Sequence, residues 1–115
     1  PPLYDLSMLE EIGRGNQEFI QKMIQLFCAQ TPVNVKHMID AYHDGDLKKM
    51  GSFAHKMKPS IDSLKISSIQ QDVRTIESAG KQNQNMQGLQ DLLMNVQITT
   101  EKVIAQIESE SVLHE

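Results

Sequence analysis

The sequence predicts an all-α protein, an antiparallel up-down four-helix bundle with a short extra helix at its N-terminus. Apolar residues recur at alternating spacings of three and four along most of the 115 residues, which is the period of one helix face. No stretch alternates apolar and polar residues as a half-buried strand does, and no hairpin turn signal appears. The predicted helices are joined by short segments, so consecutive helices should run antiparallel.

The composition fits one such domain and excludes several classes of function. We expect residues 1–115 to form a single domain, because this length is close to the commonest domain size. The net charge of −4 argues against nucleic-acid binding, for which a basic face is expected. No apolar run approaches the roughly 20 residues of a membrane span, so we expect no direct membrane contact. Cys28 is the only cysteine, which excludes an internal disulfide and fits a cytoplasmic location.

The first two helices are predicted from cap residues and from a continuous apolar stripe. Ser7 and the Glu three residues later form a capping-box pattern, with Asp5 as a competing N-cap, and this short helix should end between Gly13 and Gly15. Asn16 is a suitable N-cap for the second helix, which Gly45 should end. The stripe of the second helix comprises Ile20, Ile24, Phe27, Val35, Met38 and Tyr42. It keeps its phase through Thr31-Pro32, so we favour one long helix bent at the proline over two helices.

The third helix should run over about 46–65, with Asp46 as its N-cap. Its stripe comprises Leu47, Met50, Ala54, Met57, Ile61 and Leu64. Pro59 lies inside the helix and lacks the N–H that would bond the carbonyl of His55, so we predict a local bend at that turn. A helix that stops at Lys58 is the alternative, but the stripe continues past it.

Two further helices complete the predicted bundle. Ser67 or Ser68 should cap the fourth, which Gly80 should end, and its stripe comprises Ile66, Ile69, Val73 and Ile76. Residues 81–88 are polar and predict a loop. The last helix begins at Leu89 and should fray from about Ser109.

One histidine of the third helix has an unusual setting. His55 follows Ala54 of the stripe, so it lies about 100° around the helix and towards water. Gly51 and Pro59, one turn to either side, are compact, and Lys58 shares its face. A lone helical histidine is usually only solvated or hydrogen-bonded. Here the surroundings favour an imidazole that another protein reaches while it handles an anion.

The segment Ala54-His55-Lys56-Met57-Lys58 resembles the A-H-x-L-K-G signature of histidine-containing phosphotransfer (HPt) domains, with Met57 in the leucine position. Further similar positions are Phe27, Pro32, Ala41, Gly45-Asp46 and Ile76-Glu77. Pro59 stands where the family has glycine after the motif lysine, and Lys65 where it often has a second glycine. The resemblance implies a helical bundle that accepts phosphate from a receiver-domain phospho-aspartate on His55 and passes it to another receiver aspartate in a two-component phosphorelay.

Counting residues from the turn predicts a partner for His55. In an antiparallel hairpin centred near Ile66, Glu77 lies opposite His55, with Arg74 and Lys81 one turn to either side. We expect Glu77, directly or through a water, to accept a hydrogen bond from Nδ1–H of His55 and so leave Nε2 free. The alternative is that Glu77 only forms a surface ion pair with Lys81 or Arg74.

The remaining expectations concern transfer and docking. Nε2 of His55 should attack the phosphoryl group, and the ammonium of Lys58 should meet its oxygens. The domain should bind no cofactor and no metal, Mg²⁺ being expected on the receiver, and the absence of a P-loop motif predicts no autonomous kinase activity. Contacts with the receiver are expected from Lys48, Gly51, Ser52, Lys56, Pro59 and Asp62, with apolar surface from Met8 and Ile12.

Other interpretations stay open at this point. A helical adaptor, such as a degenerate HPt domain that docks receivers without chemistry, is favoured by Pro59 and Lys65, and a metal-binding bundle would need inward-facing ligands that the stripes lack. Because the chain begins with Pro1 and not Met, we expect a fragment of a longer protein such as a membrane-bound hybrid sensor kinase. The isolated domain should be a monomer.

Overall fold

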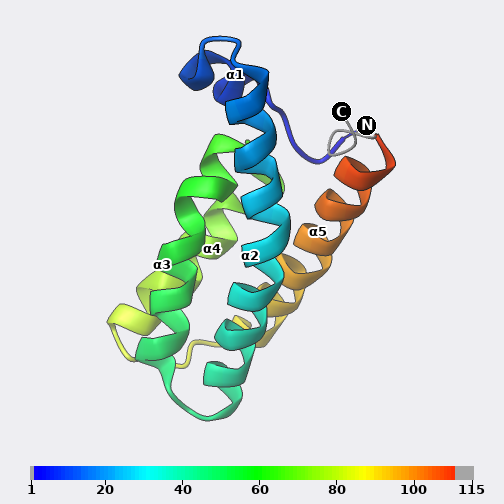
Figure 1. Ribbon diagram of the computed structural model, residues 1–115. Helices are drawn as coiled ribbons and strands as arrows, with labels where there is room; N and C mark the ends of the chain where they lie inside the picture. The colour runs from blue at the N-terminus through cyan, green and yellow to red at the C-terminus, as the bar shows by residue number, and fades with distance from the viewer. Residues whose placement is uncertain (1, 111–115) are drawn as a thin grey trace.

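Four long helices form an antiparallel bundle, and a fifth, short helix covers one end of it (Figure 1). The computed structural model describes residues 2–110, and within this range it contains helices and no strand. The elements are α1 (Ser7–Gly13), α2 (Gln17–His43), α3 (Leu47–Ser63), α4 (Ser67–Lys81) and α5 (Leu89–Ser109). The predicted fold class is therefore confirmed. The single-domain prediction covers residues 1–115, of which 1 and 111–115 lie outside the described residues. The tail predicted to fray from about Ser109 also lies outside them, except for Ser109, which ends α5, and Glu110, which follows it.

The predicted apolar stripes form the core. Their buried members include Ile24 and Met38 of α2, Met57 and Ile61 of α3, and Ile107 of α5, all at most 1% exposed. Helix α3 packs against both α2 and α4, and α5 closes the bundle against α4 and α2. Within residues 2–110, no helix combines the length and the apolar content that a membrane span requires.

Both internal prolines are accommodated without ending their helices. Helix α2 runs unbroken through Pro32, as the continuous stripe predicted, and α3 runs through Pro59 to Ser63. The alternative in which α3 stops at Lys58 is therefore wrong. The reason is burial: Ile61 and Leu64 beyond the proline are almost fully buried, which favours continuing the helix. The bends at Pro32 and Pro59 stay predictions.

Several predicted helix ends are wrong by a residue or two. Leu6 is the N-cap of α1, and the N–H of Ser7 donates to the Asp5 carboxylate over 2.8 Å, so Asp5 satisfies this end and the capping box does not form. Helix α1 ends at Gly13 as expected, but Arg14 (φ 51°) is the first left-handed residue after it.

The ends of α4 are also shifted. Ile66 occupies its N-cap position, not Ser67 or Ser68, because its side chain is fully buried at the turn and fixes where the helix begins. Helix α4 continues past Gly80 to Lys81, and Asn83 (φ 53°) takes the left-handed conformation beyond it. Asp46 and Gly45 have the predicted roles between α2 and α3: the Asp46 carboxylate accepts from the N–H of Lys49, and Gly45 has φ 77°.

Lys65 occupies the left-handed position after α3, with φ 49°. The N–H of Ile66 donates to the Ile61 carbonyl and that of Lys65 to the Asp62 carbonyl, both over 3.0 Å, a helix end that usually places glycine at the position of Lys65. Because a side chain strains this conformation, we predict that Lys65→Gly raises the free energy of unfolding by about 0.5–1 kcal/mol. Urea denaturation measures this, with Lys65→Ala as a control that should bring no gain. A loss of stability in Lys65→Gly would contradict the prediction.

Candidate functional site

His55 lies on the open side of α3, with its side chain 66% exposed. Its neighbour Ala54 is fully buried, so the helix fixes the backbone of this turn in the core while the imidazole stands in solvent. The helical phase predicted that His55 is exposed, and this is confirmed.

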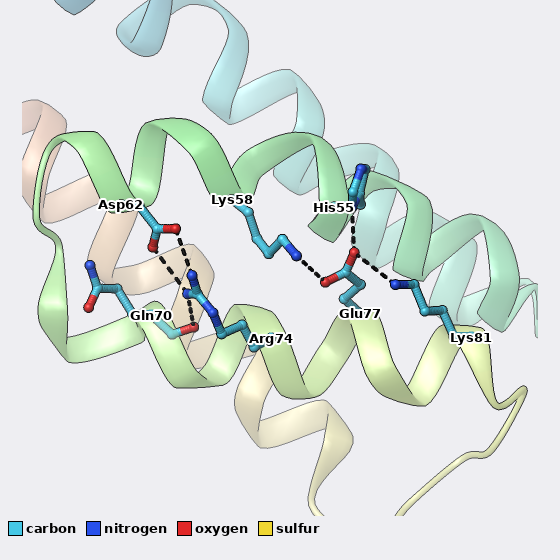
Figure 2. Close-up of polar contacts among 7 residues, drawn as sticks. All are labelled: His55, Lys58, Asp62, Gln70, Arg74, Glu77 and Lys81. Carbon is cyan, nitrogen blue, oxygen red and sulfur yellow. Dashed lines mark hydrogen bonds and ion pairs between the residues drawn. The ribbon is translucent and has the colours of Figure 1, made fainter. Parts of the chain in front are cut away.

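Glu77 reaches from α4 to the imidazole, as the counting placed it (Figure 2). Its Oε2 lies 2.5 Å from Nδ1 of His55, and its Oε1 lies 2.7 Å from Nζ of Lys58. Lys81, one turn further along α4, brings its Nζ to 3.6 Å from Oε2. The Glu77 side chain is only 7% exposed, so a buried carboxylate joins the exposed histidine to two lysines.

The charge state of Glu77 fixes the direction of its bond to His55. The hydrogen bond from Lys58, helped by that from His55, lowers the pKa of Glu77 to about 2 against the opposing effect of burial. The ionised carboxylate can only accept, so Nδ1 of His55 carries the proton and donates. In the neutral ring, Nε2 then holds the lone pair and is the nucleophilic atom.

The lowered pKa of Glu77 predicts an acid-dependent stability. A carboxyl whose pKa falls from 4.5 to about 2 on folding stabilises the fold fully above pH 4.5, and this contribution is lost as the pH falls towards 2. We expect Glu77→Gln to flatten the decline in the free energy of unfolding between these values. Urea titrations across this pH range measure the slope for both proteins. An equal slope in Glu77→Gln would contradict the assignment.

Lys58 is not simply solvated, and Arg74 is not paired with Glu77. Lys58, 28% exposed, points to Glu77 and not into open solvent. The guanidinium of Arg74 binds Asp62 through two hydrogen bonds of 2.6 and 3.1 Å. The alternative ion pair between Glu77 and Arg74 is therefore wrong, while the one with Lys81 is present beside the bond to His55.

The six residues expected to contact a receiver have different surroundings. Lys48, Ser52, Lys56 and Pro59 are exposed near His55. Asp62 is partly buried in its pair with Arg74. Gly51 is buried, and its Cα faces α4.

Two surface hollows flank the turn of α3 that carries His55. One, of about 480 Å³, is lined by residues of α3 and α4 that include Gly51, His55, Gly80, Lys48 and Lys81. The other, of about 500 Å³, lies between α1, α2 and α3. Its lining includes Met8, Ile12, Phe19, Met23, Leu26 and Pro59. Ile12 is 58% exposed and Leu26 38%.

Met8 and Ile12 were expected from the sequence to supply apolar surface here, but the α2 wall of the second hollow was not. The signal was present, since Met23 and Leu26 are apolar residues of α2 outside the stripe that fills the core. Separately, among residues 2–110 no three His, Cys, Asp or Glu side chains gather in a way that would hold a metal ion.

Comparison with known families gives one match. The sequence model of the Hpt domain matches residues 22–110, which is more than half of the chain and includes the whole turn that carries His55. No curated protein and no solved structure matches the chain.

Proposed function

The chain belongs to the Hpt domain family, the phosphotransfer modules of phosphorelay signalling, and we propose that His55 is its phosphorylated residue. His55 accepts a phosphoryl group from the phospho-aspartate of one receiver domain and passes it to an aspartate of another. The observation that carries this proposal is the pairing of an exposed imidazole with a buried, ionised carboxylate at Nδ1, which leaves Nε2 free to react.

The proposed step uses the groups of this site in a simple way. Nε2 of His55 forms a bond to phosphorus as the bond between phosphorus and the aspartyl oxygen breaks, and the aspartate leaves as a carboxylate. The ring gains positive charge, which the Glu77 carboxylate at Nδ1 stabilises at a distance of 2.5 Å. Transfer to the next receiver reverses these changes. Phosphoryl transfer depends mainly on positioning and charge neutralisation, and Mg²⁺ bound to the receiver would neutralise further charge on the phosphoryl oxygens.

Lys58 supplies the cation on this side of the transfer. Its Nζ is held by Oε1 of Glu77, one turn along α3 from His55. A phosphoryl group on Nε2 offers this ammonium a more highly charged partner. When Lys58 turns to the phosphoryl oxygens, Lys81 still neutralises Glu77 from the other side.

We propose that the receiver docks over the hollow between α1, α2 and α3. This hollow is mostly apolar and shares Lys56 and Pro59 with the turn that carries His55. Exposed apolar surface of this kind marks protein contacts, and a relay complex should use a small, transient interface. Lys48 and Ser52 extend this surface on the other side of the imidazole.

The docking surface predicts a selective effect of one polar substitution. Ile12→Gln removes exposed apolar surface without adding charge, so we expect receiver binding to weaken by about tenfold, as for one interface contact of more than 1 kcal/mol. Titration calorimetry with a receiver domain measures the affinity. Ile98→Gln on α5, also an exposed isoleucine, is the matched control and should bind normally. Equal weakening in both variants would place the docking surface elsewhere.

The function itself is tested by incubating the chain with a phosphorylated receiver and Mg²⁺. Transfer predicts a label on the chain that is labile in acid and stable in alkali, as expected of phosphohistidine. The adaptor interpretation predicts a complex with the receiver and no label on the chain. The cytoplasmic location, the monomeric state and the origin in a hybrid sensor kinase stay predictions.

A further inference from the structure

Helices α3 and α4 touch through backbone atoms beside the site, and two glycines make this contact. A Cβ added to Gly80 would lie 2.6 Å from the Cα of Gly51 and 2.7 Å from the carbonyl oxygen of Leu47. A Cβ added to Gly51 would lie 2.9 Å from the Cα of Gly80 and 3.2 Å from the carbonyl oxygen of Glu77. These neighbours belong to the backbone and cannot rotate away, so any side chain here must push the two helices apart.

This contact lies next to the bond between His55 and Glu77. Gly51 is one turn before His55 on α3, and Gly80 is one turn after Glu77 on α4. On the other side of Glu77, the pair of Asp62 and Arg74 joins the same two helices (Figure 2). Glu77 is thus enclosed between a backbone contact and an ion pair.

The distances at Glu77 depend on this close approach. Helix axes are usually 8–10 Å apart, with the side chains at the contact setting the value. The carboxylate meets His55 at 2.5 Å and Lys58 at 2.7 Å while it is 7% exposed. Hydrogen bonds from nitrogen to oxygen normally span about 2.7–3.2 Å, and a pair about 3.6 Å apart is no longer hydrogen-bonded. A wider gap would lengthen both bonds and admit water.

We infer that Gly51 and Gly80 are positioning residues for the reaction at His55, because their contact sets the distance across which Glu77 orients the imidazole. The inference rests on the proposed function for its role in transfer, but its geometric part can be measured without a receiver. It also explains why α4 continues through Gly80: the glycine serves the helix contact and not the helix end.

The test compares Gly51→Ala and Gly80→Ala with Gly13→Ala. Gly13 is the matched control, because an added Cβ there meets the side chain of Phe19, at 2.7 Å, and no backbone of another helix. Circular dichroism first establishes that each variant is folded. The ¹⁵N shifts of the His55 ring then report which nitrogen carries the proton, and ¹³C titration reports the pKa of Glu77.

We expect a graded loss of the Nδ1–H form of His55, smaller in Gly51→Ala and larger in Gly80→Ala, since the clashes at Gly80 are shorter. The pKa of Glu77 should rise from about 2 in the same order. Transfer from a phosphorylated receiver should slow by about 10- to 100-fold in Gly80→Ala, the usual cost of a misplaced reacting group. Gly13→Ala should resemble the unchanged protein in the two measurements that need no receiver, the protonation of the His55 ring and the pKa of Glu77.

A double variant separates positioning from general stability. In the Glu77→Gln background, Gly80→Ala should change the transfer rate much less than it does alone, because the contact acts through Glu77. Full additivity of the two effects would overturn the inference, as would an unchanged Nδ1–H form in both folded glycine variants. If neither variant folds, the contact is a requirement of the whole fold and the positioning claim fails. Failure of the proposed function would appear differently, as an absence of transfer by the unchanged chain.

Discussion

Replacing His55 by glutamine is expected to abolish phosphoryl acceptance while leaving the helical fold intact. Glutamine offers no nucleophilic nitrogen, but its amide can still donate to the Glu77 carboxylate, so the buried charge keeps a partner. The His55 side chain is 66% exposed, and the free energy of unfolding should change by no more than about 0.5 kcal/mol, as is usual at the surface. The measurement is the label transferred from a phosphorylated receiver, with stability followed by urea denaturation.

A second histidine provides the control for this experiment. His43 is exposed at the end of α2, where its ring contacts Tyr42. It therefore belongs to a different helix from His55 and Glu77. His43→Gln should accept as much label as the unchanged chain. Label on His55→Gln would move the phosphorylated residue elsewhere, and receiver binding without label on the unchanged chain would favour the adaptor interpretation.

Removal of the Glu77 side chain is expected to have the next largest effect. In Glu77→Ala the imidazole loses the acceptor at Nδ1, and the partly buried ammonium of Lys58 loses its carboxylate. Carboxylates that orient metal-ligating histidines typically contribute 10- to 100-fold to affinity or activity, and we expect transfer to slow by a similar factor when Glu77 is lost. Single-turnover kinetics with a saturating phosphorylated receiver measure the rate of this step and not receiver binding.

Two further variants should have transfer rates between those of the unchanged chain and Glu77→Ala. Glu77→Gln keeps an oxygen that accepts from Nδ1–H but loses the charge, so its rate should fall between those of the unchanged chain and Glu77→Ala. Asp62→Ala breaks the pair with Arg74, which links the same helices one turn away from Glu77, and at saturating receiver it should slow transfer less than Glu77→Ala. Equal rates in Glu77→Ala and the unchanged chain would show that the carboxylate does not orient the imidazole for transfer.

Much of the fold could be predicted because helix periodicity is a local property of the chain. Each stripe had to be buried, and the stripe through Pro59 to Leu64 correctly indicated that α3 continues past the proline. Helix ends were less predictable, because tertiary burial competes with cap preference. Ile66 is fully buried at the α3–α4 turn, and this placed the N-cap of α4 before the two serines.

By itself, the sequence determined that His55 is exposed and that Glu77 lies opposite it, because both follow from the helical period and the length of the hairpin. The tertiary structure decided how the charges are paired: Lys58 with Glu77, and Arg74 with Asp62. Counting along helices locates a residue to within about a turn, or roughly 5 Å. The choice among neighbouring cations depends on separations of an ångström or less, and these are set by how closely α3 and α4 approach at Gly51 and Gly80.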